Sequence, residues 1–429
     1  MSRSITKWLL SAAIMLLVVI FLVSCTEEET TDEDAEREEI IVLTMWDVSA
    51  TAEEARVITP IIERWNTENP NVQIRREGFD NESYKIKIKT AIAANEAPDL
   101  FFSWGAGFSQ PFVDAGKVLA LDGYLSDEVK NNALDGVLTN SIYNGNIYAL
   151  PYNMWFGVFY CNTELFEQYN IKLPDTYDEL LHAVREFRKH GVGPIGVGVN
   201  DRWTAMFYHN ILALRTAGAD LCNDALNQRA RFDEPEFLEA VQRLDELVKA
   251  GAFIDGHLGL GWDDMRELFK QGQIPMMFQG TWLTGELEMD DCPVKGKVVA
   301  RKFPVIEGAS GTGTEYLGGS VDVFMVSANT KHKNEAVRAL EYICQFLSED
   351  GFTEGIGLPV YKGGADLSQM DRLTVQASKL VEDSTGFVLA WDTFLVGADA
   401  QLHLNLVQEI FAGVLTPESF VEKMQNINE

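Results

Sequence analysis

Tryptophan side chains recur at one kind of position along this 429-residue chain. Four of them each come within a few residues after an apolar run that we expect to form a β-strand: Trp46, Trp104, Trp203 and Trp282. An aromatic face can stack on the apolar face of a sugar ring, while neighbouring carboxylates and amides hydrogen-bond its hydroxyl groups. The pattern therefore predicts a binding site for a polyhydroxylated ligand. Tryptophans also fill cores, so the four together carry more weight than any one of them.

Further candidates adjoin these rings. Trp155 lies in an apolar run that we interpret as a connection between two lobes, and Trp391 lies in a loop between two helical stretches. Gly318 and Gly319 end a stretch rich in glycine, threonine and serine. The polar candidates stand beside the aromatic ones: Asp47, Asn153, Asp201, Asp322 and Asp392. Because the chain holds 65 acidic residues, a single neighbour of this kind means little, and the shared pattern carries the prediction.

Alternating strands and helices must position these side chains. Residues 40–44, 71–75 and 99–102 have the composition of strands, and residues 53–69 and 84–95 have helical spacing of their apolar positions. This alternation predicts parallel βαβ units. Ligands of open α/β sheets bind outside the carboxyl ends of the strands, which is where the tryptophans fall.

A second α/β unit follows the extended segment at residues 146–166. Pro151 offers no backbone donor and breaks this segment, so that the chain can leave one sheet and enter another. We therefore predict an α/β fold of two lobes, with this segment at the floor of the cleft between them. The expected division places residues 40–152 and 318–354 in the first lobe, and residues 153–317 and 355–429 in the second.

The N-terminus has the composition of an export signal. Arg3 and Lys7 begin it, residues 8–23 are uncharged and mostly apolar, and Leu-Val-Ser-Cys ends at Cys25. Those four residues resemble the lipobox of bacterial lipoproteins, which implies that residues 1–24 are removed and that Cys25 carries lipid. A simple membrane anchor is the alternative. Residues 25–39 are strongly acidic and cannot bury a core, so we expect them to form a tether.

Composition and motifs exclude several classes of protein. A net charge of −30 disfavours nucleic acid, which is bound mainly through Lys and Arg. The six histidines contain no i,i+3 or i,i+4 pair, and no phosphate-loop, nucleophile-elbow or zinc-protease motif occurs, so we expect no metal, cofactor or catalytic residue. A literal G-x-G-x-x-G at residues 191–196 follows a helix and precedes a strand, the reverse of the dinucleotide-binding order. A glycosidase with two carboxylates needs no motif and remains the enzymatic alternative.

Cysteine spacing predicts free thiols. The four cysteines beyond residue 25 contain no C-x-x-C pair, and their spacing does not define a pairing: Cys161, Cys222, Cys292 and Cys344. Export would permit disulfides, but buried free thiols are the default expectation.

A family resemblance runs from about residue 40 to the C-terminus. The motifs that carry it include Leu-Thr-Met-Trp-Asp at 43–47, Ala-Pro-Asp-Leu at 97–100, Ile-Tyr-Ala-Leu-Pro at 147–151, Pro-Asp-Thr-Tyr-Asp-Glu-Leu at 174–180 and Leu-Gly-Gly at 317–319. In this order they resemble the extracellular solute-binding proteins of bacterial carbohydrate ABC transporters, the type similar to maltose-binding protein. Cys161 and Tyr177 depart from the residues usual in that family and lie outside the candidate site.

The resemblance implies a hinge-bending receptor, not an enzyme. Such a protein binds a carbohydrate between its lobes and delivers it to the transmembrane subunits of an ABC permease. It implies a monomer outside the cytoplasm, held by lipid in the periplasm or on the outer face of the cytoplasmic membrane. The alternatives are a surface glycoside hydrolase and a receptor for a non-sugar solute such as a peptide or polyamine.

Overall fold

The computed structural model describes residues 40–363, 368 and 370–428 of the chain. Residues 41–429 form one compact unit. The expected signal, Cys25 and the acidic tether lie outside the described residues. No helix in the described ranges is both long and apolar enough to cross a membrane.

The first of two large sheets has the strand order β2-β1-β3-β12-β6. Its strands are β1 (Ile41–Asp47), β2 (Val72–Gly78), β3 (Leu100–Trp104), β6 (Ala149–Pro151) and β12 (Asp322–Val326). β1 pairs in parallel with β2 and β3, as the alternation of strands and helices predicts. β12 returns to this sheet after the chain has built the second lobe, and it is antiparallel to β3 and β6.

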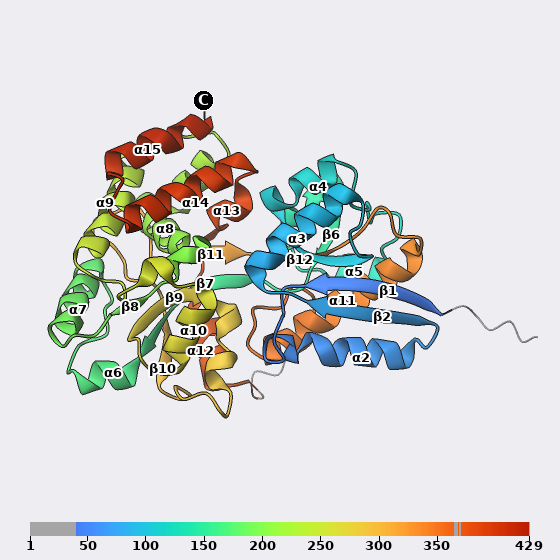
Figure 1. The fold of residues 1–429 in the computed structure, drawn as a ribbon, viewed down its shortest axis with the longest axis horizontal. Helices are drawn as coiled ribbons and strands as arrows, with labels where there is room; N and C mark the ends of the chain where they lie inside the picture. Colours follow the sequence, from blue (N-terminus) through green and yellow to red (C-terminus); the bar gives the residue numbers. More distant parts are fainter. Residues whose placement is uncertain (1–39, 364–367, 369, 429) are drawn as a thin grey trace, which may run out of the picture. The chain divides into compact units, whose positions relative to one another are not determined.

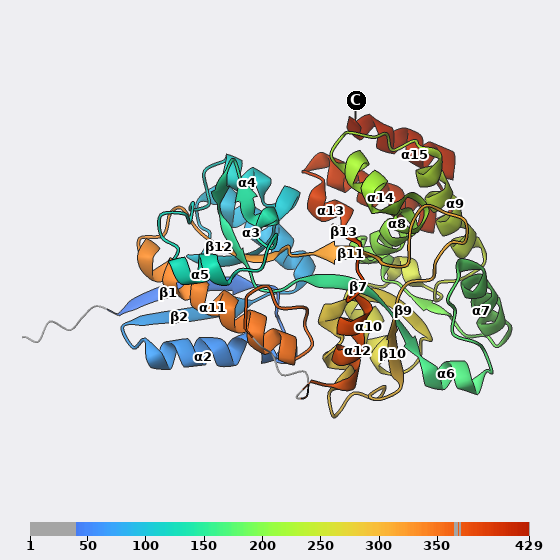
Figure 2. The ribbon, with the colours of Figure 1, turned by 180° about the vertical axis from the view of Figure 1, so that it is seen from behind.

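Helices cover both faces of the first sheet. α2 (Ile58–Glu68) buries Ile58, Ile61, Ile62 and Trp65, and it contacts α11 (Lys333–Thr353). α3 (Asn81–Ala94) begins where the carboxylate of Asp80 accepts hydrogen bonds from two backbone N–H groups of the first turn. It lies on the side of the sheet opposite to α2 and α11 (Figures 1 and 2).

The second sheet has the strand order β13-β11-β7-β9-β8, with β10 also paired to β7. Its strands are β7 (Trp155–Asn162), β8 (Ile195–Gly196), β9 (Met276–Gly280), β10 (Val298–Arg301), β11 (Glu315–Gly319) and β13 (Gly386–Val388). Every residue of β7 is buried. Its side chains alternate between two apolar cores, since Trp155 and Phe159 pack in one while Phe156 and Val158 pack in the other.

Helices also flank the second sheet on both sides (Figure 1). One group consists of α8 (Trp203–Leu226), α9 (Pro235–Lys249), α14 (Ala398–Phe411) and α15 (Pro417–Gln425), which contact one another. On the other side lie α10 (Trp262–Lys270) and α12 (Arg372–Leu380), which pack in the core containing Phe156. α7 (Tyr177–Lys189) begins with the predicted capping box of Thr176 and Glu179.

Among the described residues, the chain changes from one lobe to the other three times. It leaves β6 at Pro151 and enters β7 at Trp155, then leaves β11 at Gly319 and enters β12 at Asp322. Gly318 and Gly319 therefore belong to the second sheet, although the expected division placed residue 318 in the first lobe. Tyr361 packs in the first-lobe core, six residues beyond the expected boundary at 355, and Leu373 packs in a core of the second lobe.

All four cysteines of the described residues are buried and free, as the sequence predicts. Cys344 packs in the first-lobe core, and Cys161, Cys222 and Cys292 pack in the cores of the second lobe. Burial raises the pKa of each thiol, to about 12 at Cys161.

Candidate ligand-binding site

A cavity of about 290 Å³ is lined by side chains of both lobes. It lies where β3, β12 and the first crossing of the chain meet the ends of β7 and β9. Seven residues that the sequence singled out line it: Trp104, Asn153, Trp155, Trp203, Trp282, Asp322 and Asp392. The cavity therefore combines aromatic, amide and carboxylate groups that come from segments far apart in the sequence.

The second-lobe wall is a cluster of aromatic rings. Trp155 stacks on Phe207 with ring centroids 5.5 Å apart, and Trp282 meets Trp155 edge-on at 4.9 Å. Trp203 lies 5.3 Å from Phe207 and 5.6 Å from Trp262. Each ring is thus held by at least one other, which fixes its orientation before a ligand arrives.

A glycine allows Trp282 to lie at the end of its strand. Gly280 is the last residue of β9, and a Cβ atom there would lie 2.1 Å from the Trp282 ring. The Trp282 ring can therefore pack over the end of β9 because residue 280 is a glycine and has no Cβ atom.

The first-lobe wall is aromatic as well. Trp104, the last residue of β3, meets Phe102 at 4.9 Å and Phe108 at 4.8 Å. The Lys85 ammonium of α3 lies 5.4 Å from the Trp104 ring and 6.0 Å from the Trp203 ring. This cation therefore stands between rings of the two lobes.

Several buried polar atoms at the cavity have no hydrogen-bond partner. Among the described side chains these include Asn153 Oδ1 and Trp203 Nε1. Burial raises the pKa of Asp322 to about 7, and the opposing effect of Asn153 is smaller. Burial also raises the pKa of Asp392. One acceptor, one donor and two carboxyl groups are thus available to a polar ligand, and unsatisfied groups of this kind are costly unless something pairs with them.

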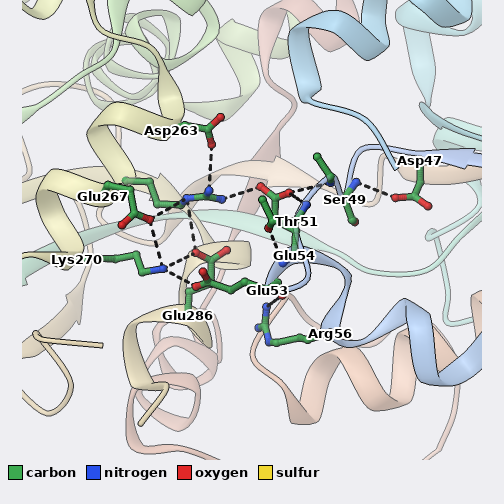
Figure 3. A network of polar contacts seen from close by, with 12 residues as sticks. Asp47, Ser49, Thr51, Glu53, Glu54, Arg56, Asp263, Glu267, Lys270 and Glu286 are labelled. Atoms are coloured by element: carbon green, nitrogen blue, oxygen red, sulfur yellow. Dashed lines mark hydrogen bonds and ion pairs between the residues drawn. The ribbon is translucent and has the colours of Figure 1, made fainter. Parts of the chain in front are cut away.

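Ion pairs join the two lobes beside the cavity (Figure 3). The loop after β1 carries Glu53 and Glu54, whose carboxylates lie 2.5 Å from the Lys270 ammonium and 2.8 Å from the Arg266 guanidinium of α10. Glu286 lies within 4 Å of both cations. Burial raises the pKa of Glu286 to about 7, although both cations lower it.

Three predicted residues lie outside the cavity because they have structural partners. The Trp46 ring packs edge-on against Phe79, with ring centroids 5.4 Å apart, on the face of the sheet that α3 covers. The Asp47 carboxylate is buried and accepts two hydrogen bonds from Arg76, at 2.5 and 2.6 Å. Trp391 is 1% exposed and lies in an aromatic cluster of the second-lobe core.

Gly318 and Gly319 also lie outside the cavity. They pair with Phe156 and Trp155 of β7, and a Cβ atom at Gly318 would lie 2.3 Å from the Trp155 carbonyl oxygen. The backbone of Gly318 has φ +138°, which other residues rarely adopt. This glycine therefore lets β11 approach the strand that carries Trp155, and so positions the aromatic wall.

Sequence reasoning missed several cavity residues. Trp262 is the first residue of α10, and no strand precedes it. The one feature of the sequence that could have indicated it is its position directly after Gly261, at the start of a helix. Lys85, Glu54 and Arg266 lie on helices or loops where charged residues are usual. No group of three or more His, Cys, Asp or Glu side chains in the described ranges is placed to hold a metal ion.

Two sheets joined by three crossings, with an aromatic cavity between them, define a two-lobe solute receptor, which is the predicted fold class. The family described as bacterial extracellular solute-binding protein matches residues 50–344, and the chain belongs to that family.

Similar proteins of known structure have the same fold. A chain from work on xylan utilization by the thermophilic bacterium Caldanaerobius polysaccharolyticus is 45% identical, with a TM-score of 0.87 over 90% of this chain and 99% of that chain. A chitin oligosaccharide binding protein is 25% identical, with a TM-score of 0.81 over 90% and 98%. By sequence, a multiple sugar-binding protein of Streptococcus mutans is 22% identical over 312 residues, 70% of each protein.

Proposed function

We propose that this chain is the sugar receptor of an ABC transporter, which binds an oligosaccharide in its inter-lobe cavity and delivers it to a membrane permease. The observation that carries this proposal is the pair of aromatic walls around the unpartnered Trp203 N–H and Asn153 carbonyl. Rings offer faces to a pyranose, and the polar atoms offer partners to its hydroxyls. Membership of the solute-binding family supports the same function.

Fragments of xylan are the first sugars to consider. The 45% identical chain comes from a study of xylan utilization, and that similarity covers nearly the whole of both chains. The cavity disfavours an anionic ligand, because six carboxyl groups line it against three cations. These are Glu54, Asp80, Asp263, Glu286, Asp322 and Asp392, against Arg56, Lys85 and Arg266.

Binding and release follow from closure of the lobes. In the open form the ligand meets one lobe, and the three crossing segments absorb the rotation as the other lobe closes on it. The ligand favours the closed form only through the contacts it gains there. The permease then recognises the two lobe surfaces that closure brings together, and a monomer is sufficient for this.

Lipid attachment at Cys25 completes the proposal, and it is supported by the N-terminal sequence alone. Cys25→Ser should release the protein from membranes or leave the signal uncleaved. Normal processing with unchanged membrane partition in that variant would contradict the anchor.

A thermal-shift screen tests the proposed function. The panel contains xylo-, cello-, malto- and chito-oligosaccharides, with a peptide mixture and spermidine as non-sugar solutes. A ligand at 100 times its Kd should stabilise the protein by about 2.7 kcal/mol. Stabilisation by spermidine or peptide alone would overturn the sugar assignment. Catalytic release of reducing ends from a bound oligosaccharide would identify a glycoside hydrolase instead.

A further inference from the structure

A second cavity, of about 330 Å³, adjoins the first. It lies between α3 and α4 (Gln110–Asp114) of the first lobe and α14 of the second. Four side chains line both cavities: Lys85, Phe108, Trp203 and Asp392. These four side chains form a wall that the two cavities share.

The lining of the second cavity repeats the chemistry of the first. Phe108, Phe112 and Trp203 supply aromatic rings, and two leucines widen the apolar surface. Its charges are balanced, with three carboxylates against three cations: Glu82, Asp201 and Asp392 against Lys85, Lys89 and Arg202. Apolar rings beside hydrogen-bonding groups suit a neutral sugar residue, as they do in the first cavity.

Trp203 is held in the shared wall by an unusual backbone. Arg202 precedes it with φ +60° and ψ −45°, a conformation that an arginine rarely adopts. The Arg202 guanidinium donates hydrogen bonds to Gln401 Oε1 at 3.1 Å and to Asn405 Oδ1 at 2.9 Å, both on α14. These bonds tie the start of α8 to the rim of the second cavity, and the indole N–H of Trp203 is left without a partner. The shared wall therefore contains the Trp203 ring, whose buried indole N–H has no hydrogen-bond partner.

We propose that the second cavity is a subsite for further sugar units, so that the bound chain runs from the first cavity past Trp203 and along α14. This rests on the proposed function, and it adds that the receptor selects an oligosaccharide longer than a disaccharide.

Gln401→Trp tests the subsite. Gln401 is exposed and lines the second cavity but not the first, so an indole there fills the subsite without disturbing a core. Calorimetry should show that xylotetraose binds the unaltered protein at least about tenfold more tightly than xylobiose. In the variant, the Kd for xylotetraose should rise by about tenfold, while the Kd for xylobiose should stay within about twofold.

Asn405→Trp is the matched control. Asn405 lies one turn further along α14, is also exposed, and also accepts a hydrogen bond from Arg202, but it does not line the second cavity. Because this variant also loses a bond from Arg202, any change it causes should affect both sugars equally, and it should not weaken xylotetraose selectively. If xylobiose binds and Gln401→Trp weakens both sugars equally or neither, the subsite is wrong while the proposed function stands. If neither sugar binds the unaltered protein, both the xylan assignment and the subsite fail.

Discussion

Trp203 and Trp391 show how one residue type serves two purposes in the same lobe. Trp203 is partly exposed, lines both cavities and keeps an unpartnered N–H. Trp391 is 1% exposed, with its ring 5.4 Å from that of Phe232 and 5.0 Å from that of His209. Burial lowers the pKa of His209 to about 3, which keeps this cluster neutral at physiological pH.

Alanine substitutions separate the two purposes. Trp203→Ala should weaken sugar binding by about 1–3 kcal/mol, or about 5- to 150-fold in Kd, with a small change in melting temperature. Trp391→Ala should instead remove about 3–5 kcal/mol of the free energy of unfolding, because it leaves a cavity in the core. Ligand-free melting and calorimetry measure both. A loss of stability without a selective loss of affinity at Trp203 would place that ring in the core.

The raised pKa of Asp322 predicts a dependence of affinity on pH. A sugar hydroxyl that donates to the carboxylate favours its charged form, so binding lowers the pKa from about 7 and releases a proton. Affinity should therefore rise with pH up to about 7 and level off above it. Asp322→Asn keeps the shape without the titration and should bind more weakly at pH 8, with a flatter profile.

The stability of the ligand-free protein should fall as pH rises, whereas the affinity for sugar should increase. The folded pKa of Asp322 lies above the ordinary value of 3.8, so its stabilising contribution is complete below that value and is lost as pH rises through about 7. Relative to the unaltered protein, the Asn variant should gain stability as pH rises from 5 to 8. An equal pH dependence of melting in the two proteins would contradict the raised pKa.

The segment between β1 and α2 belongs to the first lobe and forms ion pairs with a helix of the second lobe. Its start is fixed because the Asp47 carboxylate, held by Arg76, accepts a hydrogen bond from the Ser49 N–H at 2.7 Å. Its end reaches α10 through two ion pairs (Figure 3). Since β1 and α10 belong to different lobes, these pairs link the two lobes in the arrangement that the structure shows.

The Glu53–Lys270 pair gives a test of this role, because neither residue lines a cavity. Glu53→Gln, Lys270→Met and the double variant form a cycle. We expect a coupling of about 1–2 kcal/mol in the free energy of sugar binding, diminished by added salt. The exposed pair Glu186–Lys189 within α7 is the matched control and should show no coupling. Additive effects at Glu53 and Lys270 would show that the pair does not contribute to closure.

At the scale of the molecule, negative charge limits the choice of ligand. The chain carries a net charge of −30, and carboxyl groups outnumber cations two to one around the first cavity. A low-dielectric cleft with an excess of one charge repels ligands of the same sign.

Discrimination against acidic sugars follows from that excess. A xylotetraose that carries one glucuronic acid should bind about tenfold more weakly than the unsubstituted chain. The difference should shrink at high ionic strength, because salt screens the repulsion. Titration calorimetry at two salt concentrations measures it, with the methyl ester of the same sugar as the neutral control. Equal affinities for the acid and its ester would show that charge plays no part in selection.

Local pattern was enough to predict the two-lobe α/β fold, because strand ends can be read from the sequence, and seven of the residues proposed to bind ligand line the cavity. Trp46 lies outside the cavity because β1 runs to Asp47, so the ring stands within the strand and packs on the side that α3 covers. Trp391 and Asp392 are adjacent, yet only Asp392 lines the cavity, since a short helix directs them differently. The direction in which a side chain points in an irregular segment depends on tertiary packing. Such a segment has no periodic sequence pattern from which that direction could be predicted.

Contacts between the lobes were beyond sequence reasoning. Glu54 and Arg266 are 212 residues apart, and either could equally have been a solvated surface charge. Trp262 joins the site only because α10 brings its first turn beside Trp203.

The buried thiols make this receptor a convenient sensor. Their raised pKa values and lack of exposure make all four described cysteines poor targets for maleimide dyes at neutral pH. One new surface cysteine on each lobe would therefore take up nearly all of the label that reaches residues 40–429. Energy transfer between two such dyes would follow the opening and closing of single molecules as sugar is added.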